Sequence, residues 1–252
     1  FVHVLAGQDT RSQAQRSLYP ELITHAVDFH ADLVRNIKGI RVSQSLFDDL
    51  SSESDDQSVA IAAELATRIP SDAPLLTRPF DYGAALTYPF VRYNGHATRF
   101  SDGLEYGVWY GSTELETTVY ETVHHWRRFI ADSFATEDRD IIGERRVLQA
   151  RCDAILIDLR GKERREKRLV DRRDYRFTQQ LGAYLKQQSQ NGLMVRSARA
   201  PGTNAAIFTP RVLSRPRDLC FLTYRTNPTK DLVRVERTPG RKWMEIESSS
   251  LV

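Results

Sequence analysis

Three side chains with chemical potential stand at even spacing in the stretch "TRFSDGLEYGVWYGSTELETTVYE", residues 98–121. They are Arg99, Tyr110 and Glu121. An arginine side chain binds a phosphate or a carboxylate through two parallel hydrogen bonds. A tyrosine offers a ring that stacks on a flat heterocycle and a hydroxyl group at its tip. Together the three residue types suit an anionic ligand that carries an aromatic ring.

The residues around this stretch predict a turn, a short strand and a long helix. "RFSDG" and "GVWYGS" are typical of a turn followed by a buried strand. "ELETTVYETVHHWRRFIADSF" (114–134) predicts a helix with apolar residues at steps of three and four. These apolar residues are Leu115, Val119, Val123, Trp126 and Ile130. On this helix Glu121 lies about 200° from Val119, away from the apolar face.

A second interpretation of Glu121 is an exposed carboxylate paired with His124 or His125, three and four positions further along the helix. Such a pair stabilises a helix by only a few tenths of a kcal/mol. Adjacent histidines on a helix cannot both face one metal ion, so we predict no metal site here. Cys152 and Cys220 lack a CxxC partner and are interpreted as small buried hydrophobic residues, which fits a reducing cytoplasm.

The composition is that of a soluble globular protein, with 40% hydrophobic and 27% charged residues in a chain of 252. The net charge of +3 is too small to indicate a nucleic-acid-binding protein by itself. No apolar run approaches the roughly 18 residues of a membrane span. We therefore expect a cytoplasmic protein that does not enter a membrane.

Local patterns divide the chain into three predicted segments. Residues 1–74 are predicted to be helical, with an amphipathic helix over 19–39 between Pro20 and a stop at Gly39. Residues 75–230 interleave short β-rich pieces with helices irregularly, which predicts an α+β domain.

The remaining patterns predict further helices and the end of the chain. A second helix is predicted over 59–69, and another over 174–190 with apolar residues on one face. Those residues are Phe177, Leu181, Tyr184 and Leu185. Residues 231–252 are predicted to form a C-terminal extension with an edge segment and a frayed tail.

The stretch "RGKERREKRLVDRRDYR" (160–176) is rich in basic residues, with nine Lys or Arg against four Asp or Glu. Interspersed charges of both signs are typical of a solvated surface, which is the favoured interpretation. A surface that binds phosphate, nucleic acid or an acidic partner is the alternative. Few aromatic residues are interleaved for base stacking, which argues against single-stranded nucleic acid.

Two motifs resemble the RES domain family, bacterial toxins of RES–Xre type toxin–antitoxin systems. Residues 98–121 resemble the family's turn that opens with Arg-Phe and ends in glycine ("RFSDG"), its strand ending in tyrosine and its E-T-x-x-x-E helix. "NGLMVRSARAPGTNAAIFTP" (191–210) resembles the family's serine strand, and Ser197 is the matching serine. Upstream, Arg78 in "LLTRPF" stands where the family carries another arginine and is preferred to Arg92 on spacing. Two motifs in the right order make the resemblance specific.

The resemblance implies an ADP-ribosyltransferase-like fold, with two small packed β-sheets forming a cleft for NAD⁺ as substrate. Arg99, Tyr110 and Glu121 are the implied catalytic residues. Arg78, Arg99, Tyr110 and Ser197 are the implied NAD⁺-binding residues. The arginines suit the two phosphate charges, and the tyrosine ring suits the cationic nicotinamide. The carboxylate suits the positive charge that develops on the ribose when the glycosidic bond breaks.

Several reactions and partners follow from the resemblance and stay open at this point. NAD⁺ could be hydrolysed, phosphorolysed or used to transfer ADP-ribose to a protein. No Gly-rich phosphate loop is present, so NAD⁺ is expected as a substrate and not as a bound cofactor. An Xre-type antitoxin that covers the active site is the implied partner, and nucleic acid is expected only through it. The competing prediction is a non-catalytic binding module that uses residues 160–176.

Overall fold

The computed structural model describes residues 19–39, 80–91 and 97–251 of the chain. The strands in these residues are β1 (Ala26–Lys38), β2 (Trp109–Ser112), β3 (Ile141–Asp158), β4 (Gly192–Arg196), β5 (Thr203–Ile207), β6 (Leu213–Thr226), β7 (Leu232–Thr238) and β8 (Arg241–Glu247). The helices are α3 (Tyr82–Thr87), α4 (Leu115–Ser133) and α5 (Arg176–Gln187). Short 3-10 helices cover Tyr88–Phe90, Lys162–Arg164, Lys167–Val170, Pro210–Val212 and Ser248–Leu251. The predicted α+β class is confirmed.

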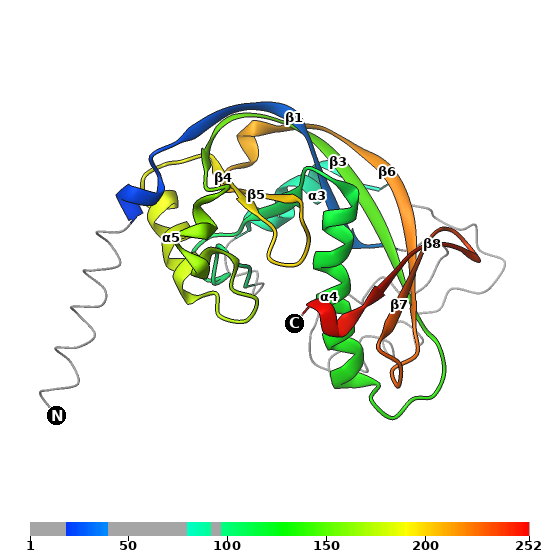
Figure 1. The fold of residues 1–252 in the computed structure, drawn as a ribbon. Helices are drawn as coiled ribbons and strands as arrows, with labels where there is room; N and C mark the ends of the chain where they lie inside the picture. The colour runs from blue at the N-terminus through cyan, green and yellow to red at the C-terminus, as the bar shows by residue number, and fades with distance from the viewer. Residues whose placement is uncertain (1–18, 40–79, 92–96, 252) are drawn as a thin grey trace, which may run out of the picture.

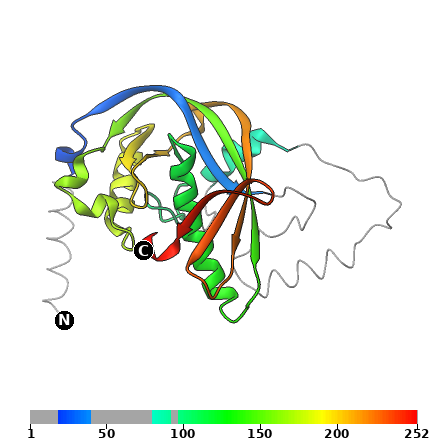
Figure 2. The ribbon, with the colours of Figure 1, turned by 45° about the vertical axis from the view of Figure 1, so that its right-hand side comes forward.

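The strands of the described residues share one sheet, in the order β1-β2-β5-β4-β3-β6-β7-β8, and β1 also pairs with β3. β1 is antiparallel to β3 along its whole length, and it meets β2 at Val34 and Ser112. Because β3 also joins β4 at its end, five strands close a ring of pairings, and β6, β7 and β8 extend from it as an open arm. Figures 1 and 2 show β1, β3 and β6 as an arch with α4 beneath it.

The structure has one continuous sheet, whereas the family resemblance implied two small packed sheets. The strands β1 and β3 have 13 and 18 residues, and β3 pairs with β1 and β4 in the ring and with β6 in the arm. Their curvature lets one hydrogen-bonded sheet turn two parts toward each other, one packed on α5 and the other on α4. The long strand β3 therefore joins the ring and the arm in one sheet.

The helix predicted over residues 19–39 is wrong for most of its length, because residues 26–38 form β1 and only residues 19–22 are helical. Val27, Phe29 and Leu33 alternate with more polar residues, and all three contact one hydrophobic cluster. That alternation has the period of a strand, but the same segment also places apolar residues at helical steps. Pairing with β3, more than a hundred residues later in the chain, decides between the two. The helix predicted over 59–69 lies outside the described residues.

Helix α4 packs its apolar face against the arm of the sheet. Val119, Val123, Trp126 and Ile130 are buried against residues of β3, β6, β7 and β8. The helical periodicity of this segment is therefore confirmed, including its bounds to within one residue. The face of α4 that carries Glu121 is turned away from this cluster and toward the β4–β5 connection.

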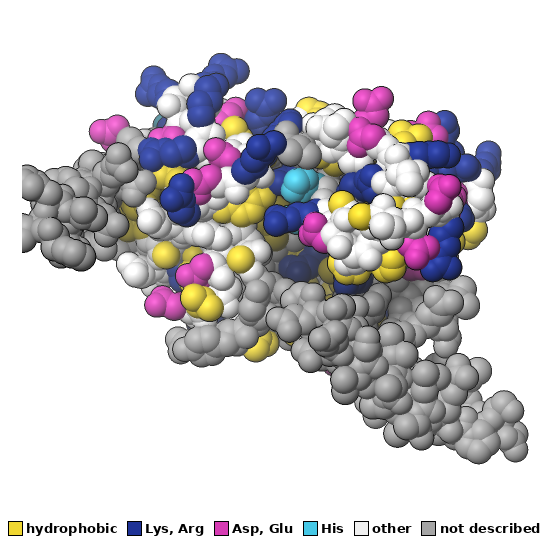
Figure 3. All heavy atoms as spheres, turned by 90° about the horizontal axis from the view of Figure 1, so that it is seen from below, with side chains coloured by type: hydrophobic (Ala, Val, Ile, Leu, Met, Phe, Trp, Pro, Cys, Tyr) yellow, Lys and Arg dark blue, Asp and Glu magenta, His cyan; other side chains and the backbone are white. Residues whose placement is uncertain are grey.

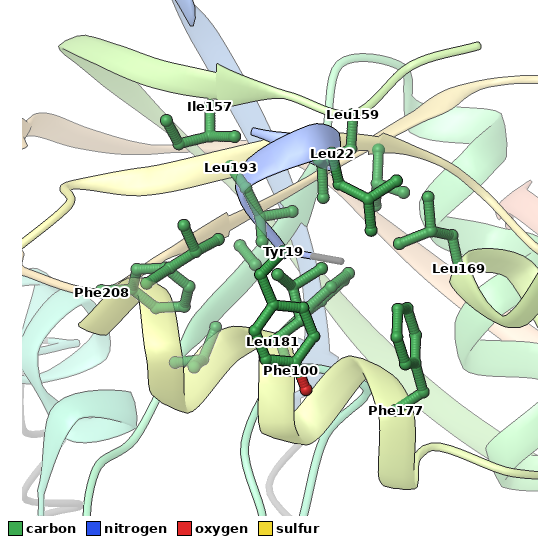
Figure 4. Close-up of a cluster of buried hydrophobic side chains, with 14 residues drawn as sticks. Tyr19, Leu22, Phe100, Ile157, Leu159, Leu169, Phe177, Leu181, Leu193 and Phe208 are labelled. Carbon is green, nitrogen blue, oxygen red and sulfur yellow. The ribbon is translucent and has the colours of Figure 1, made fainter. Parts of the chain in front are cut away.

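Helix α5 packs against β4 and β5 in a second hydrophobic cluster (Figure 4). Phe177, Leu181 and Leu185 are buried there, as the sequence predicted. A Cβ atom on Gly182 would lie 2.1 Å from the carbonyl oxygen of Phe100, so only glycine permits this close approach. The contact holds α5 directly against the backbone next to Arg99.

The C-terminal residues complete the sheet edge and return toward α4. β7 and β8 form an antiparallel hairpin, which confirms the predicted edge segment. The predicted frayed tail is wrong as far as Leu251, which is 1% exposed in the cluster beneath α4. No helix in the described ranges is both long and apolar enough to cross a membrane.

Candidate active site

The structure brings together four of the five residues that the sequence predicted for the site. Tyr110 ends up on β2, Glu121 on α4 and Ser197 just after β4, and Arg99 precedes β2 in a turn. Glu121 and Ser197 are hydrogen-bonded directly, while Tyr110 is joined to Glu121 through one intervening side chain. The fifth residue, Arg78, lies outside the described residues.

The carboxylate of Glu121 is held by three side chains. Its Oε1 accepts hydrogen bonds from Ser197 Oγ at 2.7 Å and from Asn204 Nδ2 at 2.8 Å. Its Oε2 accepts one from Arg199 Nη1 at 3.2 Å. A carboxylate has about four lone-pair positions, so three protein donors leave room for one more, on Oε2.

The interpretation of Glu121 as an exposed carboxylate is wrong, since the residue is only 9% exposed. Its helix turns it away from the apolar face, as predicted, but the connection between β4 and β5 covers it. The guanidinium of Arg199 is buried with it and forms its ion pair. Burying a carboxylate is costly unless hydrogen bonds and an opposite charge compensate for it. Here Ser197 and Arg199 supply both.

A tight turn over residues 197–202 presents Ser197 to the carboxylate. Ser197 Oγ accepts hydrogen bonds from the backbone N–H groups of Arg199 and Ala200, each at 3.1 Å. The N–H of Ser197 donates to the carbonyl oxygen of Gly202 at 2.9 Å. A Cβ atom on Gly202 would lie 1.9 Å from Thr117 Oγ1, so glycine lets the turn dock on the start of α4. The serine therefore shapes the turn and also orients Glu121.

Asn204 connects the strand and the helix of the site. This side chain on β5 has no exposed surface, and its Nδ2 donates both to Glu121 Oε1 and to the Tyr110 hydroxyl, the latter at 2.9 Å. Its Oδ1 accepts from Ser112 Oγ at 2.6 Å. Burial and the negative charge of Glu121 raise the pKa of Tyr110 above its usual value. The tyrosine hydroxyl therefore stays protonated at neutral pH.

Arg99 is fixed by backbone carbonyl groups of a later segment. Its Nη1 donates to Asp171 O at 2.6 Å and to Leu169 O at 3.5 Å, and its guanidinium lies 4.6 Å from the ring centroid of Tyr175. The positive charge of Arg99 also acts on the Tyr110 hydroxyl, so the two residues are neighbours. The sequence predicted that Arg99 binds a phosphate directly. In the structure Arg99 is only 4% exposed, and backbone carbonyl groups accept hydrogen bonds from its Nη1.

Two buried guanidinium nitrogens at this site lack a hydrogen-bond partner among the residues that the structure describes. They are Nη2 of Arg99 and Nε of Arg199. A buried donor without a partner is costly, and a water molecule, an ion or a ligand can supply the missing acceptor. The two nitrogens are therefore candidate donors to an anionic group.

The basic stretch 160–176 forms part of the frame of the site. Arg160, Arg168 and Arg176 each form an ion pair with an acidic residue two positions earlier in the chain. Arg172 donates to Ala198 O at 2.9 Å, which ties the stretch to the turn that carries Ser197. These contacts favour a structural role for the stretch over nucleic-acid binding.

Sequence reasoning named neither Arg199 nor Asn204 as a site residue. Arg199 stands two residues after Ser197, inside the serine motif, and this position was a usable signal. Asn204 is a polar residue in the otherwise small and apolar strand "TNAAI", and a buried polar side chain in a strand indicates a specific partner. Glu121 and Tyr110, the partners of Asn204, are distant in the sequence, so only the tertiary structure identifies them.

Two histidines follow Glu121 on α4, and neither is hydrogen-bonded to it. Burial first, and the charge of Arg199 second, lower the pKa of His124 to about 4. The same two causes lower the pKa of His125. Both imidazoles are therefore neutral near pH 7 and do not act as counter-ions of the carboxylate.

We expect the depressed pKa of His124 to make the fold less stable in mild acid. The unfolded chain binds more protons than the folded chain between pH 6.5, the ordinary value, and about 4, so the free energy of unfolding falls as pH is lowered through this window. His124→Gln should reduce the fall between pH 7 and pH 5, measured by urea unfolding.

His30 provides a control of opposite sign for this measurement. Its hydrogen bond to Asp153 raises its pKa, so its contribution to stability is present in acid and lost as pH rises. His30→Gln should therefore enlarge the fall in stability between pH 7 and pH 5. An unchanged fall in the His124→Gln variant would contradict the assignment.

Comparison with known proteins assigns the chain to a family. The RES domain family model matches residues 65–227. Among solved structures, the crystal structure of the M. tuberculosis MbcT–MbcA toxin–antitoxin complex is similar, with 13% sequence identity, a TM-score of 0.42, and coverage of 81% of this chain and 88% of that chain. Among curated proteins, no sequence matches the chain.

Proposed function

Because the chain belongs to the RES domain family, we propose that it is the toxin of a toxin–antitoxin pair and cleaves the nicotinamide–ribose bond of NAD⁺. The observation that carries the proposal is the carboxylate of Glu121, buried and oriented by three donors, with one acceptor position left on Oε2. An oriented carboxylate can stabilise the positive charge that develops on the sugar when a glycosidic bond breaks.

In the proposed reaction the bond between the ribose carbon and the nicotinamide nitrogen breaks. The electron pair leaves with the nicotinamide, and positive charge develops on the ribose. Oε2 of Glu121 accepts a hydrogen bond from a ribose hydroxyl and stabilises this charge. Water or inorganic phosphate then forms the new bond to the ribose carbon, and water also releases a proton. The products are nicotinamide and either ADP-ribose or its 1″-phosphate.

The other residues of the site have roles that match the parts of NAD⁺. The neutral ring of Tyr110 stacks on the cationic nicotinamide. The buried nitrogen of Arg99 that lacks a partner in the described part of the chain donates to a phosphate oxygen. Ser197 holds the carboxylate and contacts the substrate only through it. Arg78 remains a proposed NAD⁺-binding residue.

A small excess of positive charge supports an anionic substrate or partner. Figure 3 views the molecule from below the arch and shows Lys and Arg side chains near the middle of this face, with Asp and Glu side chains among them. The net charge of the chain is +3, and positive charge attracts anionic molecules. We propose an Xre-type antitoxin as the partner that covers the site, and the cytoplasm of a bacterium as the place of action.

The expected result for the purified protein is release of free nicotinamide with loss of NAD⁺, followed by chromatography. Activity that needs phosphate indicates phosphorolysis, and activity without phosphate indicates hydrolysis. Label transferred from NAD⁺ to a protein of a cell lysate indicates ADP-ribosyl transfer, the second candidate reaction. NAD⁺ that stays unchanged in phosphate, in phosphate-free buffer and with lysate would contradict all three reactions.

A further inference from the structure

The segment of residues 169–175 lies against both arginines of the site. Arg99 donates to two of its carbonyl groups, as described above. Arg199 Nη2 donates to the carbonyl oxygen of Arg172 at 3.1 Å and to the hydroxyl of Tyr175 at 2.9 Å. One segment therefore holds both the arginine that pairs with the carboxylate and the arginine that we propose binds a phosphate of NAD⁺.

Tyr175 is the residue of this segment whose side chain touches both arginines. Its ring centroid lies 4.6 Å from the guanidinium carbon of Arg99, which is a cation–π contact. Its hydroxyl accepts the hydrogen bond from Arg199. The ring and the hydroxyl thus act on two different groups of the site.

Tyr175 is itself held by the start of α5. Its carbonyl oxygen accepts hydrogen bonds from Gln179 N at 2.8 Å and Thr178 Oγ1 at 3.0 Å. Gln179 Nε2 donates in turn to Thr98 O at 3.0 Å, next to Arg99. Because α5 is buried through Phe177, the tyrosine has a fixed position relative to both arginines.

We propose that Tyr175 is a positioning residue with two separable effects, its ring fixing Arg99 and its hydroxyl fixing Arg199. The ring holds Arg99 where its buried Nη2 meets a phosphate of the substrate. The hydroxyl holds Arg199, and Arg199 holds Oε2 of Glu121 for the bond-breaking step. The catalytic consequences rest on the proposed cleavage of NAD⁺, whereas the contacts with the two arginines do not.

Two substitutions separate the ring from the hydroxyl. Tyr175→Phe keeps the ring and removes one charge-assisted hydrogen bond, so kcat for nicotinamide release should fall about tenfold with KM for NAD⁺ changed less than about twofold. Tyr175→Leu removes the ring as well, so KM should also rise by about tenfold. Tyr184→Phe, a matched change in α5 outside the site, should leave both constants at the wild-type value.

A merely structural role of Tyr175 gives a different pattern of constants. If Tyr175 only stabilised the fold, its substitution would lower the amount of folded protein. KM would then be unchanged in both variants, and the rate per folded molecule would equal the wild-type rate. That pattern, or a KM that rises as much for Tyr175→Phe as for Tyr175→Leu, would overturn the proposal. Far-UV circular dichroism and urea unfolding give the folded fraction of each variant.

A stability cycle tests the hydroxyl contact without NAD⁺. Tyr175→Phe and Arg199→Lys are made singly and together, and the midpoints of urea unfolding are compared. If the hydroxyl acts through Arg199, Tyr175→Phe should lower the midpoint in the wild-type background and have much less effect in the Arg199→Lys background. Equal effects in both backgrounds would overturn the proposal.

The kinetic comparison and the stability cycle together distinguish a failure of the positioning role from a failure of the proposed function. A wild-type protein that does not release nicotinamide contradicts the proposed function, and the stability cycle still decides whether Tyr175 positions Arg199. A wild-type protein that is active, with Tyr175→Phe equally active, contradicts the positioning role alone.

Discussion

Nicotinamide release from NAD⁺ is expected to fall at least about 100-fold when Glu121 is replaced by Gln, the size of effect seen when one oriented electrostatic group is removed from an active site. The amide has nearly the same shape as the carboxylate but carries no negative charge to stabilise the developing positive charge on the ribose. It also turns an N–H group toward donors that need an acceptor. Glu121→Ala should lose at least as much activity.

The substitution should act on the rate more than on substrate binding. The charge on the ribose is largest in the transition state, so the loss of the carboxylate should appear in kcat, with a smaller change in KM. The protein must remain folded for this comparison, and its circular dichroism spectrum and thermal unfolding curve give that information.

Glu116→Gln is the matched control for this prediction. Glu116 lies on the same helix, in its first turn, but its side chain is exposed. The same chemical change should leave nicotinamide release close to the wild-type rate. If folded Glu121→Gln protein kept the rate of the Glu116→Gln variant, Glu121 would have no catalytic role.

Replacing Asn204 by Asp is expected to destabilise the protein by at least about 2 kcal/mol and to lower its activity strongly. The new oxygen would take the place of Nδ2, which lies 2.8 Å from Oε1 of Glu121. Two carboxylates at this distance repel each other in a buried site, where water cannot screen them. The hydrogen bond that orients Glu121 is also lost. Urea unfolding at neutral pH and the nicotinamide assay measure the two effects.

Asn227→Asp is the control for the charge change. Asn227 Nδ2 donates to Asp138 Oδ1 at 3.1 Å, so the substitution again faces a carboxylate with a carboxylate, but in an exposed contact. Its cost should stay within about 1 kcal/mol, because solvent screens exposed charges. Equal costs at the two positions would mean that burial of the Asn204 contact is not what makes it important.

The two predictions distinguish charge from orientation in the same site. Glu121→Gln removes the charge of the carboxylate, whereas Asn204→Asp leaves that charge and disturbs its orientation. Loss of activity in both variants indicates that the carboxylate must be present and also held by Asn204. Because Asn204 also donates to the Tyr110 hydroxyl, its substitution affects the strand and the helix of the site together.

The local sequence determined the helices of the site region and the identity of its main residues. Apolar residues at steps of three and four on α4 and α5 define one face of each helix, and this information lies within about twenty residues. The motifs around Glu121 and Ser197 are equally local, so they could be recognised from the chain alone. That Glu121 leaves the apolar face also follows from helix geometry.

The tertiary structure decided the parts that depend on distant segments. Residues 26–38 satisfy both helical and strand periodicity, and only pairing with β3 makes them a strand. Helix geometry turns Glu121 away from one core, but only the turn of residues 197–202 decides that it is buried and paired with Arg199. Arg99 likewise finds its acceptors about seventy residues later in the chain. A local pattern records which face a side chain occupies, while the partner that covers that face is set by long-range packing.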